Sequence, residues 1–127
     1  MWRNNSTIGI AYCANPDYCS PVVNVIQLLA REHTLVVVCR NQDDPQVGYP
    51  DNVRLFRLGR LKTVRQKEAQ HPTIKIFEYA TFIIRAVFYF RFFRCRCLYC
   101  FDGHGLLSGF IASRCGRRLP IIYHNLE

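Results

Sequence analysis

The sequence predicts an α/β fold: a Rossmann-like, doubly wound sheet of parallel strands with helices on both faces. Short apolar runs such as residues 8–13 and 34–39 have the length and continuous hydrophobicity of strands buried on both sides. Segments with helical periodicity, such as residues 20–32 and 74–93, alternate with these runs. Half of the 127 residues are hydrophobic and the mean hydropathy is −0.03. We therefore expect one globular domain over residues 1–127.

The first βαβ unit lies near the N-terminus. Residues 8–13 predict a short central strand, and residues 15–17 have the composition of a turn. Ser20 followed by Pro21 is typical of an N-cap and the first residue of a helix. The Val-rich run at residues 34–39 predicts the next strand, and the crossover between the two strands should be right-handed.

A weaker strand and a strongly apolar helix follow. Arg54 and Arg57 interrupt the strand pattern of residues 53–58, so we expect this strand at the edge of the sheet. After a polar, basic connector, residues 74–93 predict a helix that is apolar on most sides. Such a helix needs two apolar neighbours. The sheet is one of them, and the other is either a lipid surface or a further domain.

The C-terminal part predicts a second βαβ unit. Residues 95–101 and 120–123 read as strands, and residues 107–114 mark a helix between them. Gly116 suits the position just after the helix C-terminus. The alternation of elements predicts a doubly wound sheet with the strand order 3-2-1-4-5.

In this order, polar residues from the ends of strands meet at one edge of the sheet. Ligands of open α/β sheets bind in the crevice at the switch point, here between the first and fourth strands. The candidate ligand-contacting residues are Asn15 and Asp17 after the first strand, Asp102, Gly103 and His104 after the fourth, and His124, Asn125 and Glu127 after the fifth.

The strongest candidates have structural alternatives, which the residues alone leave open. Asp102 either caps the following helix or joins its N–H groups in contacting a sugar hydroxyl or a phosphate. His104 is either a solvated turn residue or part of the same contact. His124 is either a satisfied core residue or a group that hydrogen-bonds to a ligand.

The last segment, which ends in His124-Asn125-Leu126-Glu127, resembles the N-terminal, acceptor-side half of family 4-type, retaining glycosyltransferases of the two-domain GT-B architecture. The resemblance extends over residues 8–127. That family commonly has a histidine at the end of this strand, close to the transferred sugar, which implies that His124 is catalytic and stabilises developing charge. In the same family, the turn after the preceding strand lies at the acceptor cleft, which implies this role for Asp102, Gly103 and His104. The loop at residues 13–20 departs from the family, because it lacks the glycines that many members carry there.

The resemblance implies transfer of a hexose, with retention, from a nucleotide diphosphate sugar to a glycan or lipid-linked acceptor, without a cofactor or a metal. In the family, the donor site and a paired-glutamate motif belong to a C-terminal half that these residues do not include. We therefore expect a fragment of a longer enzyme that is inactive by itself. The alternative is a non-catalytic, basic α/β module that binds a membrane surface or a partner protein.

The net charge of +8 predicts an anionic partner. Nucleic acid is not expected, because the sequence contains no recognisable nucleic-acid-reading element. Aromatic and basic residues occur together in helix 74–93, as in interfacial membrane helices, while its internal charges argue against a membrane span. The residues expected to dock on an anionic surface are Phe82, Arg85, Tyr89, Arg91 and Arg94. We expect a cytoplasmic protein, and the docking residues predict peripheral association with the inner face of the membrane.

The cysteines do not indicate a metal or redox site. There are seven, scattered over strands, helices and turns, which suits a reducing cytosol better than a disulfide framework. Cys97 and Cys100 form a CxxC motif, but there is no second ligand pair and the two side chains of a strand at this spacing point to opposite faces.

Overall fold

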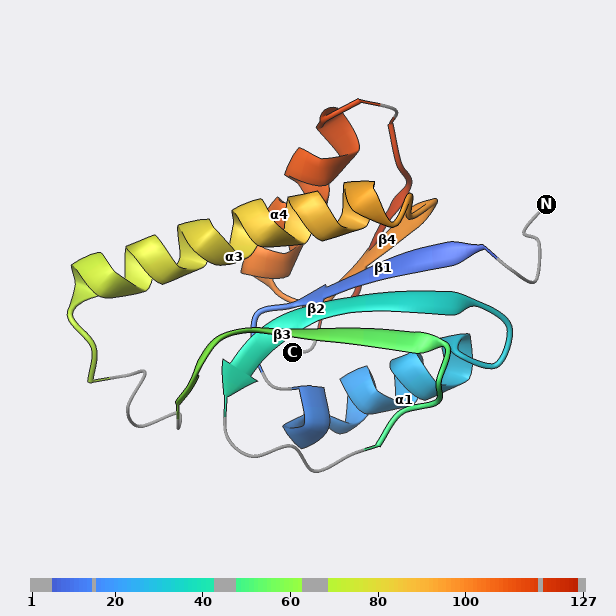
Figure 1. The fold of residues 1–127 in the computed structure, drawn as a ribbon, viewed down its shortest axis with the longest axis horizontal. Helices are drawn as coiled ribbons and strands as arrows, with labels where there is room; N and C mark the ends of the chain where they lie inside the picture. Colours follow the sequence, from blue (N-terminus) through green and yellow to red (C-terminus); the bar gives the residue numbers. More distant parts are fainter. Residues whose placement is uncertain (1–5, 15, 43–47, 63–68, 117, 126–127) are drawn as a thin grey trace.

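Helices and strands alternate along the chain as the sequence predicts (Figure 1). The computed structural model describes residues 6–14, 16–42, 48–62, 69–116 and 118–125. The elements are β1 (Thr7–Tyr12), the 3₁₀ helix η1 (Pro16–Tyr18), α1 (Ser20–Leu29), β2 (Thr34–Gln42), β3 (Val53–Lys62), α3 (Pro72–Phe92), β4 (Cys97–Cys100), α4 (Gly103–Arg114) and β5 (Ile121–Tyr123). The five strands form one sheet in the order β3-β2-β1-β4-β5, and every pairing is parallel. The predicted fold class and strand order are therefore confirmed, including the edge position of β3.

The N-termini of α1, α3 and α4 differ from the sequence-based prediction, and α3 begins at Pro72 rather than at Ile74. The N-cap of α1 is Cys19 rather than Ser20, because the Cys19 amide donates to the Pro16 carbonyl at 3.0 Å and closes η1 directly before the helix. The predicted Pro21 does lie in the first turn. Helix α4 begins at Gly103, several residues before the predicted start, because Asp102 caps it. Gly116 has a φ of +113°, as expected of the residue that ends a helix.

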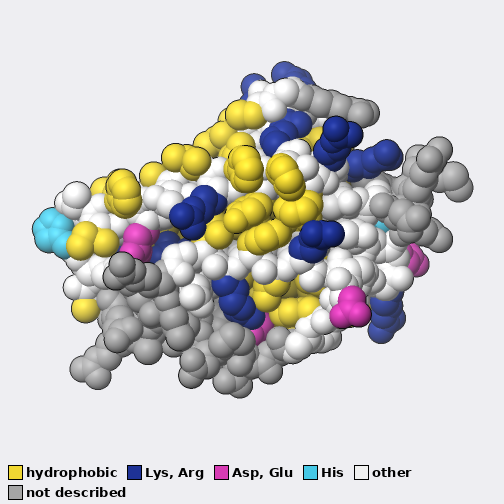
Figure 2. All heavy atoms as spheres, in the orientation of Figure 1, with side chains coloured by type: hydrophobic (Ala, Val, Ile, Leu, Met, Phe, Trp, Pro, Cys, Tyr) yellow, Lys and Arg dark blue, Asp and Glu magenta, His cyan; other side chains and the backbone are white. Residues whose placement is uncertain are grey.

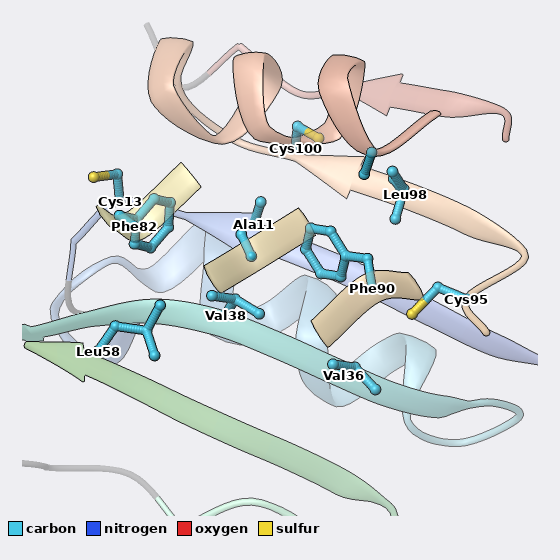
Figure 3. Close-up of a cluster of buried hydrophobic side chains, with 12 residues drawn as sticks. Ala11, Cys13, Val36, Val38, Leu58, Phe82, Phe90, Cys95, Leu98 and Cys100 are labelled. Carbon is cyan, nitrogen blue, oxygen red and sulfur yellow. The ribbon is translucent and has the colours of Figure 1, made fainter. Parts of the chain in front are cut away.

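Each face of the sheet has its own hydrophobic core. On one face α1 packs against alternate residues of β1 and β2, and on the other α3 and α4 pack against the residues between them (Figures 1 and 3). The α1 core includes Ile10, Val22, Ile26, Leu35 and Val37. The α3 core includes Ala11, Val36, Val38, Phe90 and Leu98. Because successive side chains of a strand point to opposite faces, each central strand supplies both cores.

The inward face of α3 corrects one sequence-based assignment. The helix packs on the sheet through Phe82, Ala86 and Phe90, which recur every four residues. A Cβ at Gly9 would lie 2.6 Å from the Phe90 ring, so glycine in β1 allows the close approach. Phe82 is only 1% exposed, and its assignment to a membrane-docking face was therefore wrong. Among the described residues, no helix combines the length and apolar character needed to cross a membrane.

Two further residues expected to dock on a surface hold α3 against its neighbours instead. The Tyr89 ring stacks on Phe56 of β3, with 4.1 Å between the ring centroids and 13° between the ring planes. The Arg91 guanidinium donates to the Ala112 carbonyl of α4. Arg85 and Arg94 are exposed.

Candidate functional site

Three of the predicted site residues, Asp17, Asp102 and His124, follow strands at the same edge of the sheet. Asp102 follows β4, His124 follows β5, and Asp17 lies in η1 after β1. Because all strand pairings are parallel, these carboxyl ends share one edge. Asn15 and Glu127 lie outside the described residues.

Asp102 joins the loop after β1 to the start of α4. Its Oδ1 accepts a hydrogen bond from the Gly105 amide at 2.5 Å, and its Oδ2 accepts one from the Cys13 amide at 2.9 Å. A Cβ at Gly105 would lie 2.6 Å from the Ala11 carbonyl oxygen, so glycine lets α4 begin close to β1. Of the two alternatives for Asp102, the capping role is confirmed, and its carboxylate fixes the geometry of the switch point. Its contact with substrate stays a prediction.

Asp17 has a structural role that differs from the predicted substrate contact. Its side chain is fully buried, and its carboxylate pairs with Nη2 of Arg57 at 2.9 Å. The Tyr49 hydroxyl donates to the other oxygen at 2.8 Å. Burial, followed by the hydrogen bond to Asp17, raises the pKa of Tyr49. The ion pair stabilises η1 against β3, because the edge strand brings Arg57 beneath the loop after β1.

His124 is held by Tyr99 of β4 and by Phe101, which directly follows that strand. Its Nδ1 lies 2.9 Å from the Tyr99 hydroxyl, and its ring centroid lies 5.4 Å from that of Phe101. Its backbone amide donates to the Cys100 carbonyl at 2.9 Å. The imidazole is half-buried, and no described residue hydrogen-bonds to its Nε2. When Tyr99 donates to Nδ1, Nε2 carries the proton and can donate to a ligand.

The start of α4 places His104 over an aromatic residue of α3. Its exposed ring stacks on Tyr79 with 4.0 Å between centroids and 17° between planes. The Arg40 guanidinium lies 5.6 Å from the centroid of the same Tyr79 ring. Burial raises the pKa of Tyr79. Gly103 in the first turn of α4 and Asn125 after β5 are both exposed.

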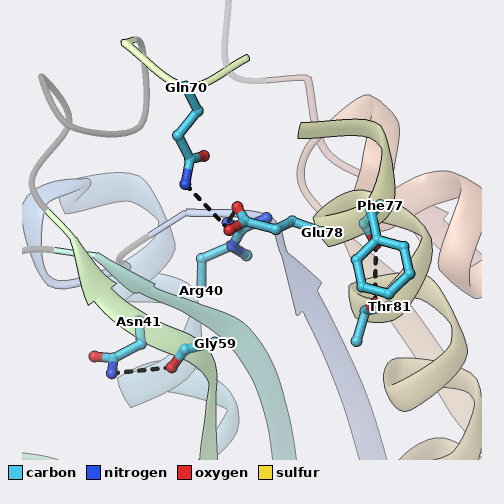
Figure 4. Close-up of polar contacts among 7 residues, drawn as sticks. All are labelled: Arg40, Asn41, Gly59, Gln70, Phe77, Glu78 and Thr81. Carbon is cyan, nitrogen blue, oxygen red and sulfur yellow. Dashed lines mark hydrogen bonds and ion pairs between the residues drawn. The ribbon is translucent and has the colours of Figure 1, made fainter. Parts of the chain in front are cut away.

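Arg40, Glu78 and Tyr79 were not predicted as site residues. Arg40 ends the apolar core of β2 and is only 7% exposed, although it carries a charge. Its Nη2 pairs with the Glu78 carboxylate at 2.7 Å, and Gln70 donates to the other carboxylate oxygen at 3.2 Å (Figure 4). The one signal in the sequence was an arginine directly after a continuous apolar strand, which is equally typical of a residue that begins a surface loop.

Three buried cysteines lie in environments that keep their thiols protonated. Burial raises the pKa of the Cys39, Cys95 and Cys100 thiols to about 12. A thiolate is the form that attacks carbonyl groups or binds metals, so these side chains are unreactive at neutral pH. In the described part of the chain, no group of three or more His, Cys, Asp or Glu residues could hold a metal ion.

No known protein family or curated protein matches this chain. The scan against family models gives no match, and the search of curated proteins gives no significant one. The fold and the residues at the carboxyl edge of the sheet are therefore the basis for a functional proposal.

Proposed function

We propose that this chain is the acceptor-side domain of a retaining GT-B-type glycosyltransferase, which moves a hexose from a nucleotide diphosphate sugar to a glycan or lipid-linked acceptor. The observation that carries the proposal is His124 at the carboxyl end of β5. One ring nitrogen is held by Tyr99 and the other has no partner among the described residues. The doubly wound parallel sheet supports the proposal, because this fold binds ligands at the same edge.

In the proposed reaction, His124 donates from Nε2 to the sugar. A hydrogen bond that strengthens as charge develops in the transition state lowers the barrier, whereas one that is equal in both states does not. Tyr99 acts through His124 by holding the ring and selecting its tautomer. It is therefore a positioning residue.

The N-terminus of α4 supplies a second binding element. Gly103 and His104 lie in its first turn, where amide groups lack partners within the helix and favour oxygen-rich or anionic ligands. Asp102 already binds the Gly105 amide, which leaves the earlier amides for the acceptor. The exposed His104 ring, supported by Tyr79, would border the same site.

We propose that the donor diphosphate binds mainly to a second Rossmann-like domain outside these 127 residues. The experiment is a mass-spectrometric assay of hexose transfer, with a panel of nucleotide diphosphate hexoses and of glycan and lipid-linked acceptors. It compares the product of the complete reading frame with the 127-residue chain. Transfer by the longer protein but not by the 127-residue chain supports both proposals. Transfer by the 127 residues alone contradicts the need for a second domain, and no transfer with any donor by the longer protein contradicts the proposed function.

A second proposal, peripheral docking on an anionic membrane, rests on the outer face of α3. Large apolar side chains on this helix are exposed, and Figure 2 shows them following α3 across the molecule with Lys and Arg between them. They are Ile74, Ile76, Phe77, Ile84, Phe88 and Phe92, with exposed fractions of 50–73%. Monomeric proteins seldom expose a continuous apolar patch of this kind without a partner.

The exposed arginines favour a lipid surface as that partner. Arg85 lies on α3, and Arg94 and Arg96 follow its C-terminus. Each cationic side chain near an anionic leaflet contributes about 1 kcal/mol of attraction. The face thus contains both components of an interfacial helix, apolar area and positive charge. The same face would serve the non-catalytic alternative, a basic module that binds a membrane, which the transfer assay distinguishes from an enzyme.

A further inference from the structure

A cavity lies between α3 and the carboxyl ends of β2 and β3, apart from His124. Its volume is about 280 Å³. One wall is apolar and is formed by Leu58, Ile74, Phe77 and Phe82. Its polar end is formed by Arg40 and Glu78, which Figure 4 shows meeting between β2 and α3. Arg85, which is exposed, also lines it.

The Arg40 guanidinium is only partly satisfied within the described protein. Its Nη2 pairs with Glu78, but its Nη1 is buried and has no hydrogen-bond partner. A buried donor without a partner is unfavourable, and native proteins rarely retain one without a reason. Arg40 lines the cavity, so an acceptor oxygen bound at its polar end would lie beside this guanidinium. Because the guanidinium carries a charge, an anionic oxygen would form the stronger bond.

We propose that this cavity binds the phosphate group of an amphiphile, a phosphate carried on an apolar chain. The phosphate accepts from Nη1 of Arg40 and from Arg85, and the chain lies against Ile74 and Phe77. A phosphate monoester offers three oxygens and can accept from both guanidinium groups at once. Arg40 and Arg85 together outweigh the single negative charge of Glu78, so the cavity favours an anion.

The apolar wall argues for an amphiphile rather than a free phosphate. Ile74 and Phe77 line the cavity and are also 50% and 73% exposed, so the wall continues onto the outer apolar face of α3. In Figure 1 the first turns of α3 extend beyond the tip of the β2 arrow. The volume is at the lower limit of ordinary ligand pockets, roughly 300–1,000 Å³, so the cavity suits a headgroup and a short stretch of chain rather than a whole nucleotide sugar.

The test measures binding of decyl phosphate to the 127-residue chain by titration calorimetry, with inorganic phosphate, decanol and decanoate as separate arms. We expect saturable one-to-one binding of decyl phosphate, with an affinity at least about tenfold higher than that of inorganic phosphate, decanol or decanoate. Each of these three lacks either the buried chain or at least one of the charge-assisted hydrogen bonds. Equal affinity for inorganic phosphate overturns the amphiphile, equal affinity for decanol overturns the anion, and equal affinity for decanoate overturns the choice of phosphate.

Variants locate the binding at the cavity. Arg40→Met would leave Glu78 without its ion-pair partner and endanger folding, so Arg85→Gln and Thr81→Leu carry the test. Thr81 lines the cavity, and a leucine there fills part of it while leaving the Arg40–Glu78 pair in place. The matched control is Arg31→Gln, which removes an exposed arginine just after α1, on the opposite face of the sheet.

Arg85→Gln should weaken decyl phosphate binding about tenfold, Thr81→Leu should weaken it at least as much, and Arg31→Gln should change it less than about twofold. If Arg85→Gln and Thr81→Leu both bind like the parent chain, the cavity is not the site. Decyl phosphate binding does not depend on hexose transfer. If decyl phosphate does not bind, the proposed glycosyltransferase function is unaffected. If no hexose is transferred, the proposed phosphate site is likewise unaffected.

Discussion

The Tyr99 hydroxyl lies 2.9 Å from Nδ1 of His124, so a side chain within β4 holds the imidazole at the end of β5. The neighbouring Phe101 ring limits the movement of the same imidazole. The two strands are paired in parallel, with Tyr99 opposite Ile122. The position of the proposed catalytic group therefore depends on the register of the sheet rather than on a loop.

Replacing Tyr99 by Phe should separate positioning from folding. The variant loses the hydrogen bond to His124 while its ring remains, so the free energy of unfolding should fall by only about 1 kcal/mol. In the proposed longer enzyme, kcat should fall about tenfold with little change in KM, because a misplaced donor acts mainly on the transition state. Steady-state kinetics and urea denaturation provide these values. Tyr123→Phe, at a half-exposed position in β5, is the matched control, and an equal loss of kcat in both variants would contradict the positioning role.

Two glycines in the first turn of α4 should respond differently to alanine. At Gly105 a Cβ would lie 2.6 Å from the Ala11 carbonyl oxygen, so Gly105→Ala should cost about 1–3 kcal/mol of stability. At Gly103 no atom lies within 4 Å of the added Cβ, so Gly103→Ala should leave stability unchanged or raise it by up to about 1 kcal/mol. Urea denaturation of both variants tests the close approach of α4 to β1. Similar effects of the two substitutions would contradict it.

Stability should decrease at alkaline pH. The ordinary pKa of 9.0 applies to the Cys95 and Cys100 thiols in the unfolded chain, whereas burial raises the pKa of each to about 12 in the folded protein. Above pH 9 the unfolded state therefore binds fewer protons than the folded state, and the free energy of unfolding falls as the pH rises towards 12. The slope contributed by each thiol reaches at most about 1.4 kcal/mol per pH unit.

Urea denaturation under reducing conditions from pH 8 to 10.5 measures this slope. Replacing Cys95 by Val removes one buried thiol and should reduce the slope. Replacing Cys115 by Val is the matched control, because this cysteine is exposed and lies outside the core. An identical slope in all three proteins would show that the buried thiols are not its source.

Membrane docking should depend on the outer face of α3. Replacing Phe88 and Phe92 by Ser removes exposed apolar surface, so binding to anionic vesicles should fall by at least about tenfold, given roughly 1.5–3 kcal/mol for a fully buried large side chain. Binding by the parent chain should also weaken as salt is added. Leu28→Ser is the control, because Leu28 is 61% exposed on α1, which covers the other face of the sheet. Vesicle flotation with no difference between anionic and neutral lipid would exclude docking through charge.

Most of the fold was predictable from the sequence, because the order of apolar runs and helical segments determines the order of strands and helices. Arg54 and Arg57 identified β3 as an edge strand, and the apolar runs at β1 and β2 identified strands buried on both faces. The inward face of α3 was misassigned because this helix is apolar on most sides. The packing that buries Phe82 is set by contacts with the sheet and not by the helix alone.

The site was less predictable because its contacts join distant segments. The Asp17–Arg57 pair connects the loop after β1 to β3, and neither residue indicates the other in the sequence. The sequence around Arg40 is typical of a surface residue, whereas in the structure Arg40 is buried and pairs with Glu78 of α3. By contrast, the cap formed by Asp102 is local, and its position before a helix made capping one of the two alternatives that the sequence offered.

The kinetic effect of His124→Ala on hexose transfer by the longer enzyme tests the central claim most directly. His71→Asn is the matched control, because it also removes an imidazole while retaining a side chain that can cap α3. If His124 is the charge-stabilising donor, His124→Ala should lower kcat about a hundredfold or more while the protein keeps its native stability, and His71→Asn should leave kcat unchanged. Turnover by His124→Ala equal to that of the parent enzyme would contradict the account.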